Sequence, residues 1–300
     1  MDNSKIIQGL MRVNEISDDD LYNLIKFDIE NGITFFDLAD CYSNGLVEEK
    51  LGRVLKNNPS LREQMFIQTK CSITRDKTRG TYYDLSYKHI IESVNNSLNR
   101  MQIDYIDCLL LHRPDIFMDN KEIAKAFKEL KTSGKVHYFG VSNFSKEMIE
   151  YLNEELEDKI VIDQVQLGLG HTRLLEEGLN FNMINNEGIS YTNDTYFYLK
   201  RNNIILQAWS PFLVGFFEGS IFDKIKYPQI NAKLDELAKK YSTSKCAIAT
   251  SFLLTLGDNI RVITGAIKQN HIKECLDGIN IKLEKPDWYD LYKSVGKMLP

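Results

Sequence analysis

The sequence lacks any run of about 18 consecutive apolar residues, the length that a membrane-spanning helix needs. Its first ten residues, MDNSKIIQGL, carry charge where a signal peptide would have an apolar stretch. Basic residues are not in surplus either, because 37 Lys and Arg stand against 42 Asp and Glu, which gives a formal charge of −5. We therefore expect a cytoplasmic protein that binds neither membranes nor nucleic acid.

Cysteine is scarce and shows none of the spacings of a metal site or a disulfide framework. The five cysteines are Cys41, Cys71, Cys108, Cys246 and Cys275. Their number is odd and no C-x-x-C pair occurs, so we expect free thiols in a reducing compartment. The sequence also contains no H-E-x-x-H, G-x-S-x-G or P-loop motif. No metal site is predicted.

The composition that remains is that of a globular protein with a large core: 300 residues, of which 43% are hydrophobic and 26% charged. Eight short β-rich apolar runs recur at residues 6–10, 33–37, 66–70, 106–111, 137–141, 161–166, 204–209 and 261–264. Amphipathic stretches typical of helices lie at residues 18–31, 47–56, 87–101, 120–133, 146–155, 191–201, 229–241 and 268–279. Glycine is favoured at helix C-caps, and three glycines stand at such positions in the predicted helices: Gly32, Gly134 and Gly278.

Eightfold alternation of strand and helix over a chain of this length predicts an α/β protein with a (β/α)8 barrel, the TIM barrel. No Pro/Gly/Ser-rich linker divides the chain, so a single domain over residues 1–300 is expected. A two-domain, doubly wound fold is the alternative.

Polar residues follow the apolar runs at the points where strands end, and strand ends form the catalytic face of a barrel. These residues are Asp37, Lys70, His112, Ser142, Asn143, Gln164, Trp209 and Ser210. We expect them to gather at that face.

Tyr42 lies five residues after Asp37, on the loop beyond the strand end. The ammonium of Lys70 would lower the tyrosine pKa from its usual value near 10 and so permit proton exchange near neutral pH. Asp37 would keep the lysine charged, and His112 could bind a substrate oxygen. The four residues form a plausible proton-transfer set.

Several segments resemble the aldo-keto reductases. They are NGITFFDLADCYSNGLVEEKLG (31–52), FIQTK (66–70), LLLHRPD (109–115), SGKVHYFGVSNF (133–144), DQVQ (163–166) and AWSP (208–211). The strongest match is the Asp-x-Ala-x-x-Tyr spacing followed by Glu48 and Gly52. The resemblance runs from about residue 6 to residue 273, and the stretch after His112 is most similar to the bacterial YdhF-type branch.

The resemblance implies a catalytic tetrad of Asp37, Tyr42, Lys70 and His112, with Tyr42 as the general acid. It also implies NADP(H)-dependent reduction of a small aldehyde or ketone. The cofactor would be held without a Rossmann fold, its carboxamide by Ser142, Asn143 and Gln164 and its nicotinamide ring against Trp209, with Ser210 beside it.

The sequence departs from the family pattern where the family binds the rest of the cofactor. Phe212 and Leu213 replace the usual Leu-Gly after Ser210-Pro211. Lys268 is retained for the 2′-phosphate, but His271 stands where many members have arginine, and Cys275 replaces an asparagine. NADP(H) is the expected cofactor and NAD(H) the alternative.

Other interpretations stay open. The chain could be an NADP(H)-binding regulatory or redox-sensing subunit with slow turnover, or a cofactor-free lyase that uses Lys70 as a Schiff base. The basic segment TRDKTRG (74–80) suggests a solvated loop, and Cys41 and Cys71 are expected to serve packing rather than redox sensing. The physiological substrate and the oligomeric state are not predicted.

Overall fold

A computed structural model describes residues 2–181, 183, 186, 192, 194–215 and 218–299. The parallel strands are β1 (Ile6–Gly9), β2 (Phe35–Asp37), β3 (Phe66–Cys71), β6 (Ile106–Leu111), β7 (Val136–Ser142), β8 (Ile162–Gln166), β9 (Ile205–Trp209) and β10 (Ile260–Thr264). They form a closed barrel in the order β1-β10-β9-β8-β7-β6-β3-β2. The predicted (β/α)8 barrel is confirmed, and the doubly wound alternative is wrong.

The described helices agree with most of the predicted stretches. They are α1 (Asp18–Glu30), α2 (Leu46–Asn57), α3 (Tyr87–Met101), α4 (Asn120–Thr132), α5 (Lys146–Glu155), α6 (Arg173–Leu179), α7 (Thr195–Arg201), α8 (Pro228–Lys240), α9 (Lys245–Leu254), α10 (Gln269–Asp277) and α11 (Lys285–Ser294). The predicted stretch 191–201 begins partly outside the described residues. None of the helices in the described part of the chain combines the length and apolar character that a bilayer crossing requires.

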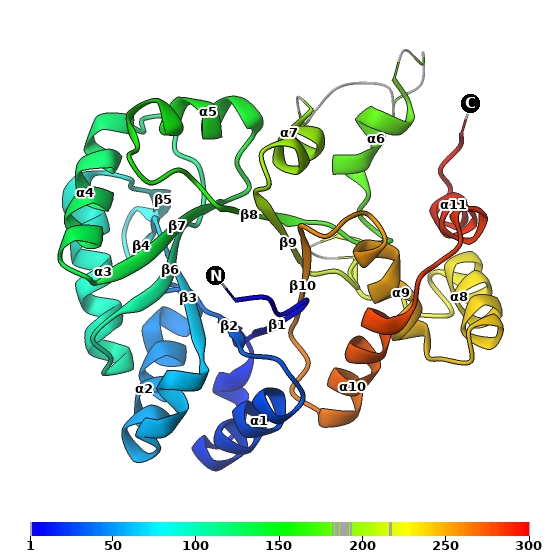
Figure 1. The fold of residues 1–300 in the computed structure, drawn as a ribbon, viewed down its shortest axis with the longest axis horizontal. Helices are drawn as coiled ribbons and strands as arrows, with labels where there is room; N and C mark the ends of the chain where they lie inside the picture. Colours follow the sequence, from blue (N-terminus) through cyan, green and yellow to red (C-terminus); the bar gives the residue numbers. More distant parts are fainter. Residues whose placement is uncertain are drawn as a thin grey trace. The chain divides into compact units, whose positions relative to one another are not determined.

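The chain divides into two compact units, Met1–Gln164 and Val165–Pro300. In the first unit, helices α2, α3 and α4 lie outside strands β2, β3 and β6 (Figure 1). Helix α4 also packs on β7, where the rings of Phe127 and Phe139 stack with centroids 4.0 Å apart. The single domain over residues 1–300 stays a prediction.

In the second unit β9 pairs in parallel with β10. Trp288 of α11 stacks on Phe252 of α9 with ring centroids 4.7 Å apart, and its Nε1 donates to the Phe252 carbonyl oxygen at 2.9 Å. Helix α9 was not among the predicted stretches because its residues from Cys246 to Leu253 are all buried. A helix that is apolar on every side has no amphipathic period to detect.

All three glycines predicted at helix C-caps lie at the C-terminal end of a helix. Gly32 and Gly134 have φ of +81° and +72°, the left-handed backbone that favours glycine. Gly278 is the C-cap residue of α10, as predicted, but its φ is −64°, so left-handed backbone is not the reason for glycine at this position. Glycine is needed there for another reason: a Cβ would lie 2.7 Å from the Ala247 carbonyl oxygen.

The basic segment TRDKTRG is not a loop. Residues Ile73–Asp76 (β4) and Gly80–Tyr83 (β5) form an antiparallel hairpin inserted between β3 and α3. Asp76 fixes its turn, because its Oδ1 accepts hydrogen bonds from the backbone N–H groups of Thr78 and Arg79, both at 2.8 Å. The exposure predicted for the segment is correct, and its exposed β5 strand is a short edge.

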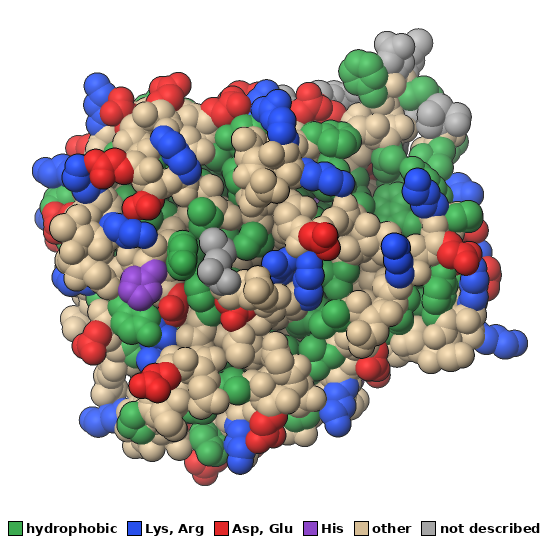
Figure 2. Space-filling view, viewed as in Figure 1, with side chains coloured by type: hydrophobic (Ala, Val, Ile, Leu, Met, Phe, Trp, Pro, Cys, Tyr) green, Lys and Arg blue, Asp and Glu red, His purple; other side chains and the backbone are tan. Residues whose placement is uncertain are grey.

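Charged side chains of both signs are interspersed over the face drawn in Figure 2. The structure contains ion pairs between exposed groups, such as Lys128 with Glu157 and Lys88 with Glu92. Pairs of this kind contribute about 1 kcal/mol or less each to stability, so the fold depends chiefly on its buried core.

Candidate active site

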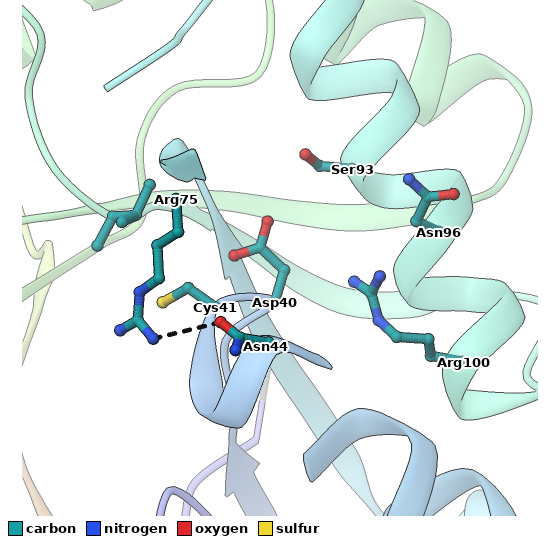
Figure 3. Close-up of a pocket in the computed structure, with 8 residues that line it drawn as sticks. Asp40, Cys41, Asn44, Arg75, Ser93, Asn96 and Arg100 are labelled. Carbon is teal, nitrogen blue, oxygen red and sulfur yellow. Dashed lines mark hydrogen bonds between the residues drawn. The ribbon is translucent and has the colours of Figure 1, made fainter. Parts of the chain in front are cut away.

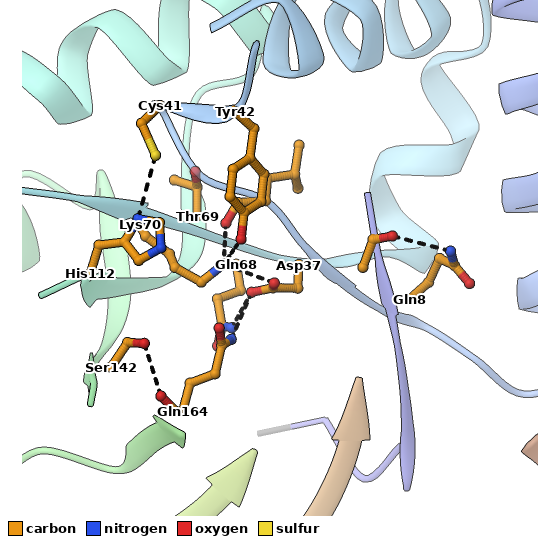
Figure 4. Close-up of polar contacts among 12 residues, drawn as sticks. Gln8, Asp37, Cys41, Tyr42, Gln68, Thr69, Lys70, His112, Ser142 and Gln164 are labelled. Carbon is orange, nitrogen blue, oxygen red and sulfur yellow. Dashed lines mark hydrogen bonds and ion pairs between the residues drawn. The ribbon is translucent and has the colours of Figure 1, made fainter. Parts of the chain in front are cut away.

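Lys70 is the centre of a cluster of buried polar groups at the ends of β2 and β3 (Figure 4). Its side chain is fully buried. Nζ donates to Oδ2 of Asp37 at 2.8 Å, to the Leu38 carbonyl oxygen at 2.6 Å and to the hydroxyl of Tyr42 at 3.2 Å. Three of the four predicted tetrad residues are therefore in direct contact.

The turn that carries Tyr42 follows β2 with an unusual backbone. Ser43, Asn44 and Gly45 all have positive φ, at 47°, 56° and 89°. This left-handed run reverses the chain between the strand and α2, and it brings the tyrosine hydroxyl back to Lys70. A Cβ on Gly45 would lie 2.9 Å from Cδ of Arg100, so a larger residue would disturb the turn.

The carboxylate oxygen of Asp37 that does not contact Lys70 accepts hydrogen bonds from two side-chain carboxamides. Oδ1 accepts hydrogen bonds from Nε2 of Gln68 at 2.6 Å and from Nε2 of Gln164 at 3.0 Å. Gln68 does not stand out in the sequence, because it lies within a strand rather than at its end. The available signal is its position two residues before Lys70, which places both side chains on one face of β3.

Charge and burial act against each other at this cluster. Burial alone would lower the pKa of Lys70, but Asp37 and Tyr42 stabilise the ammonium and the net pKa is raised. Burial also raises the pKa of Tyr42, and this effect outweighs the stabilisation of a phenolate by Lys70. The expectation of a net lowering for Tyr42 is therefore wrong, and the phenol stays protonated at neutral pH.

His112 follows β6 and faces the same cluster. Its ring is edge-on to the ring of Tyr42, with centroids 5.9 Å apart, and its Nδ1 lies 3.6 Å from Sγ of Cys41. Burial lowers the pKa of His112 well below its usual value, and the charge of Lys70 adds to the effect. The imidazole is thus neutral and can present one N–H to a substrate oxygen.

Cys41 and Cys71 are buried beside the cluster. Burial raises the pKa of Cys41 to about 11 and that of Cys71 well above the usual thiol value. Neither forms a thiolate near neutral pH, and thiolates are the reactive species in redox chemistry. Both observations favour the packing interpretation.

A second polar cluster joins the ends of β7 and β8. Oγ of Ser142 donates to the Gln164 carbonyl oxygen at 2.8 Å and accepts from Nδ2 of Asn143 at 2.8 Å. Asn143 has φ of +62°, which turns its side chain back onto Ser142. Because Gln164 also binds Asp37, this cluster is continuous with the tetrad.

The other predicted cofactor residues belong to the second unit. Trp209 ends β9, and Ser210 follows it with φ of +49°. Lys268 is the N-cap residue of α10, and His271 lies in the first turn of the same helix; both side chains are exposed. A helix N-terminus with two basic side chains suits an anionic group such as a phosphate.

The Glu48 and Gly52 positions of the matched motif have a structural role. Glu48 is buried, accepts a hydrogen bond from Oγ1 of Thr69 at 2.6 Å, and pairs with the guanidinium of Arg100 at 2.8 Å. At Gly52 a Cβ would lie 2.2 Å from the Arg100 carbonyl oxygen. These residues join α2 to α3 and thereby support the turn that carries Tyr42.

Known proteins resemble this chain along nearly its whole length. It is 33% identical to the uncharacterized oxidoreductase YcsN of Bacillus subtilis, over 97% of this chain and 94% of the relative. It is 31% identical to a 6-dehydroglucose reductase of Agrobacterium fabrum, over 98% and 95%. The predicted likeness to the YdhF type is confirmed by 29% identity to oxidoreductase YdhF of Escherichia coli, over 97% and 93%.

Solved structures share the fold. A thermostable aldo-keto reductase in complex with the inhibitor epalrestat superposes with a TM-score of 0.75 at 24% identity, over 97% of this chain and 94% of that one. An aldo/keto reductase from Klebsiella pneumoniae in complex with NADP and acetate gives 0.72 at 18% identity, over 96% and 89%. Residues 5–295 match the aldo/keto reductase family as a whole, so this chain belongs to that family of oxidoreductases.

Proposed function

We propose that this protein reduces aldehydes or ketones to alcohols, with NADPH as the hydride source and Tyr42 as the proton donor. One observation carries the proposal: the hydroxyl of Tyr42 lies 3.2 Å from the buried ammonium of Lys70. A phenol that is protonated at rest and lies beside a fixed positive charge can give up its proton when a neighbouring oxygen becomes negative.

Each tetrad residue then has a separate task. Tyr42 donates its proton to the carbonyl oxygen, and Lys70 stabilises the phenolate that remains. Asp37 keeps Lys70 charged and oriented through the 2.8 Å contact. The neutral imidazole of His112 donates an N–H to the same carbonyl oxygen and helps to hold it while negative charge develops.

The side chains present fit a nicotinamide cofactor. A carboxamide needs both donors and acceptors, and Ser142, Asn143 and Gln164 provide hydroxyl and amide groups in one cluster. An indole such as that of Trp209 offers a flat apolar face to a nicotinamide ring. When bound, the cofactor would supply the hydride to the carbonyl carbon.

The preference for NADP(H) over NAD(H) rests on the exposed Lys268 and His271 at the start of α10. Both can approach a 2′-phosphate, which NAD(H) lacks. The related Klebsiella pneumoniae structure has NADP bound, which supports the same choice. The name of the Agrobacterium relative, a 6-dehydroglucose reductase, supports the reduction of carbonyl compounds.

The two rival functions make different demands: one on the protonation state of Lys70, the other on the rate of NADPH oxidation. A Schiff-base lyase needs an unprotonated lysine, and Lys70 has a raised pKa and three hydrogen-bond partners. This environment disfavours the lyase. A regulatory subunit would bind NADPH but oxidise it at the same low rate with or without a carbonyl compound.

The experiment is to follow NADPH oxidation with a panel of aldehydes and ketones for the wild type, Tyr42→Phe and Tyr83→Phe. Loss of a general acid should lower kcat of Tyr42→Phe by about 10² to 10⁴-fold, with NADPH affinity nearly unchanged. Tyr83 is an exposed residue of the hairpin and serves as the matched control. The proposal is wrong if the wild type turns over no carbonyl compound, or if Tyr42→Phe keeps the wild-type kcat.

A further inference from the structure

Two cysteines of the second unit have their sulfur atoms in contact. Cys246 lies in the first turn of α9 and Cys275 in the last turn of α10, and their Sγ atoms are 3.3 Å apart. Both are free thiols, and both are buried, with 8% and 1% of their surface exposed. The two residues are 29 positions apart in the sequence, so the fold itself brings the sulfurs together.

The close approach of α9 and α10 explains this contact. The two helices lie side by side (Figure 1). Gly278 ends α10, and a Cβ there would lie 2.7 Å from the carbonyl oxygen of Ala247 and 2.7 Å from Cβ of Thr250. Because Ala247 directly follows Cys246, and Gly278 comes three residues after Cys275, the helices are closest at the level of the two thiols. The pair therefore lies in a tightly packed part of the second unit.

Hydrogen bonds give the two thiols different roles. Sγ of Cys275 donates to Oγ1 of Thr264 at 3.7 Å, which leaves its lone pairs to accept the S–H of Cys246. The hydrogen bond from Cys246 lowers the pKa of Cys275, although burial acts in the opposite direction, and the hydroxyls of Thr264 and Thr250 add to the lowering. The same hydrogen bond raises the pKa of Cys246. Cys275 is therefore the thiol that ionises first, and thiolates are the reactive species.

The other three cysteines lie in the first unit and differ in both respects. Burial raises the pKa of Cys41 to about 11 and those of Cys71 and Cys108 well above the usual thiol value. Cys41 lines a cavity of about 220 Å³ together with Asp40 and parts of its own turn, β4 and α3 (Figure 3). Its sulfur contacts Nδ1 of His112. Of the five cysteines, the pair in the second unit alone combines a lowered pKa with a neighbouring thiol.

We propose that Cys246 and Cys275 are a redox site, which hydrogen peroxide converts to a disulfide within the native packing of α9 and α10. The thiolate of Cys275 attacks one peroxide oxygen, the O–O bond breaks, and the other oxygen leaves as hydroxide and takes up the proton of Cys275. The sulfenic acid that results is attacked by the sulfur of Cys246, and its oxygen leaves as water with the proton of Cys246. Two thiols and one peroxide thus give one disulfide and two water molecules.

The position of the pair determines what the bond would hold together. It would tie α9 to the end of α10, the helix whose first turn carries the exposed Lys268 and His271. Hydrogen peroxide is scarcely larger than water, and the exposed surface of Cys246 is its route to the pair. No residue of the tetrad takes part, so the redox site can be tested without NADPH or a carbonyl compound and does not depend on the proposed function.

The test counts thiols in the full-length protein before and after treatment with a small molar excess of hydrogen peroxide. The wild type has five thiols, and the count in denaturant should fall by two and return to five after reduction with dithiothreitol. Peptide mapping without reduction should find one linked pair of peptides, which contain Cys246 and Cys275. Because the bond closes a long loop, the Tm of the oxidised protein should exceed that of the reduced protein by on the order of 5 °C.

Three variants locate the effect. Cys246→Ala and Cys275→Ala should give no linked peptides and no rise in Tm, and the same treatment of Cys275→Ala measures any effect of methionine oxidation. The matched control Cys108→Ala removes a buried thiol of the first unit, and it should still lose two thiols. The thiol count and peptide map of the wild type decide the question even if a variant fails to fold.

Three results would overturn the proposal. The redox site does not exist if the wild type keeps five thiols, or if the linked peptides contain any other pair of cysteines. It is equally wrong if the Tm fails to rise on oxidation, because the disulfide would then form only by distorting the packing of α9 against α10. None of these results bears on the reduction of carbonyl compounds, which the kinetics of Tyr42→Phe tests separately.

Discussion

Gln68 donates a hydrogen bond to Oδ1 of Asp37 at 2.6 Å, on the carboxylate oxygen that Lys70 does not contact. Both residues are buried, so the carboxylate is fixed from two sides in a region without bulk water. The orientation of Asp37 in turn fixes Lys70 against Tyr42. Gln68 is thus a positioning residue that acts through Asp37.

The first prediction concerns Gln68→Leu. Loss of this hydrogen bond frees the Asp37 side chain, and small displacements in a catalytic site cost large factors in rate. We expect kcat to fall about tenfold, with KM for NADPH within twofold of wild type. Steady-state kinetics together with thermal unfolding would check it. A variant that loses stability but keeps kcat would show that Gln68 serves only packing.

The second prediction concerns the pH dependence of kcat with propanal at saturating NADPH. The pKa of His112 lies well below its usual value and that of Tyr42 lies above 10, so neither group titrates between pH 6 and 8. In Asp40→Asn, which removes a neighbouring carboxyl whose pKa is about 7, the profile should be flat over this range and fall only in alkaline solution, as Tyr42 loses its proton. A limb with a midpoint near 6.5 in that variant, the usual histidine value, would contradict a neutral His112.

The third prediction concerns Asp28 on α1, which is fully buried and whose two carboxyl oxygens have no hydrogen-bond partner among the described residues. Burial raises its pKa to about 8. The folded state therefore holds a proton that the unfolded chain releases near pH 4, so this contribution to stability is complete below pH 4 and is lost as pH rises to 8.

Asp28→Asn should remove this pH dependence. We expect the gain of the variant over wild type in the free energy of unfolding to be on the order of 4 kcal/mol larger at pH 8 than at pH 5, because each pH unit between them is worth about 1.4 kcal/mol. Urea unfolding at both pH values would measure it. Asp19→Asn, an exposed change on the same helix, is the control and should leave the pH slope unchanged. Equal effects of Asp28→Asn at both pH values would contradict the prediction.

The fourth prediction concerns His271→Arg at the start of α10. Arginine is always charged and binds phosphate through two parallel hydrogen bonds. The dissociation constant for NADPH should fall about three- to tenfold and that for NADH should not change, whereas Lys268→Ala should weaken NADPH alone. Fluorescence titration with both cofactors would measure the constants. If His271→Arg lowered the dissociation constant for NADH by the same factor, His271 would not contact the 2′-phosphate.

Sequence patterns were sufficient for the strands and for the residues at their ends. Asp37 and Lys70 stand out because polar residues there break an apolar run, and the structure joins them at 2.8 Å. Gln68 was missed because it lies inside β3 rather than at its end, and its position two residues before Lys70 indicates a role only once its partner Asp37 is known. The eight strands agree with prediction to within about two residues at each end.

Other features of the site could not be predicted, because they depend on which groups are buried in the folded chain. The direction of the Tyr42 pKa follows from a competition between Lys70 and desolvation, and the second effect exists only in the folded chain. The hairpin of β4 and β5 was missed because its strands are only four residues long and lack alternating apolar residues, with β4 half-buried and β5 exposed. The cavity at Asp40 combines three elements and has no contiguous motif.

The close fit between Gly52 and the backbone of Arg100 also limits how this protein can change over evolutionary time. A side chain at residue 52 would displace α3, and Arg100 on that helix holds Glu48 and lies against the turn at Gly45. The turn bearing Tyr42 and helix α3 must therefore vary together. Recombination between relatives that exchanges one without the other should yield folded barrels with a misplaced phenol, whereas exchange of residues 40–101 as one block should keep activity.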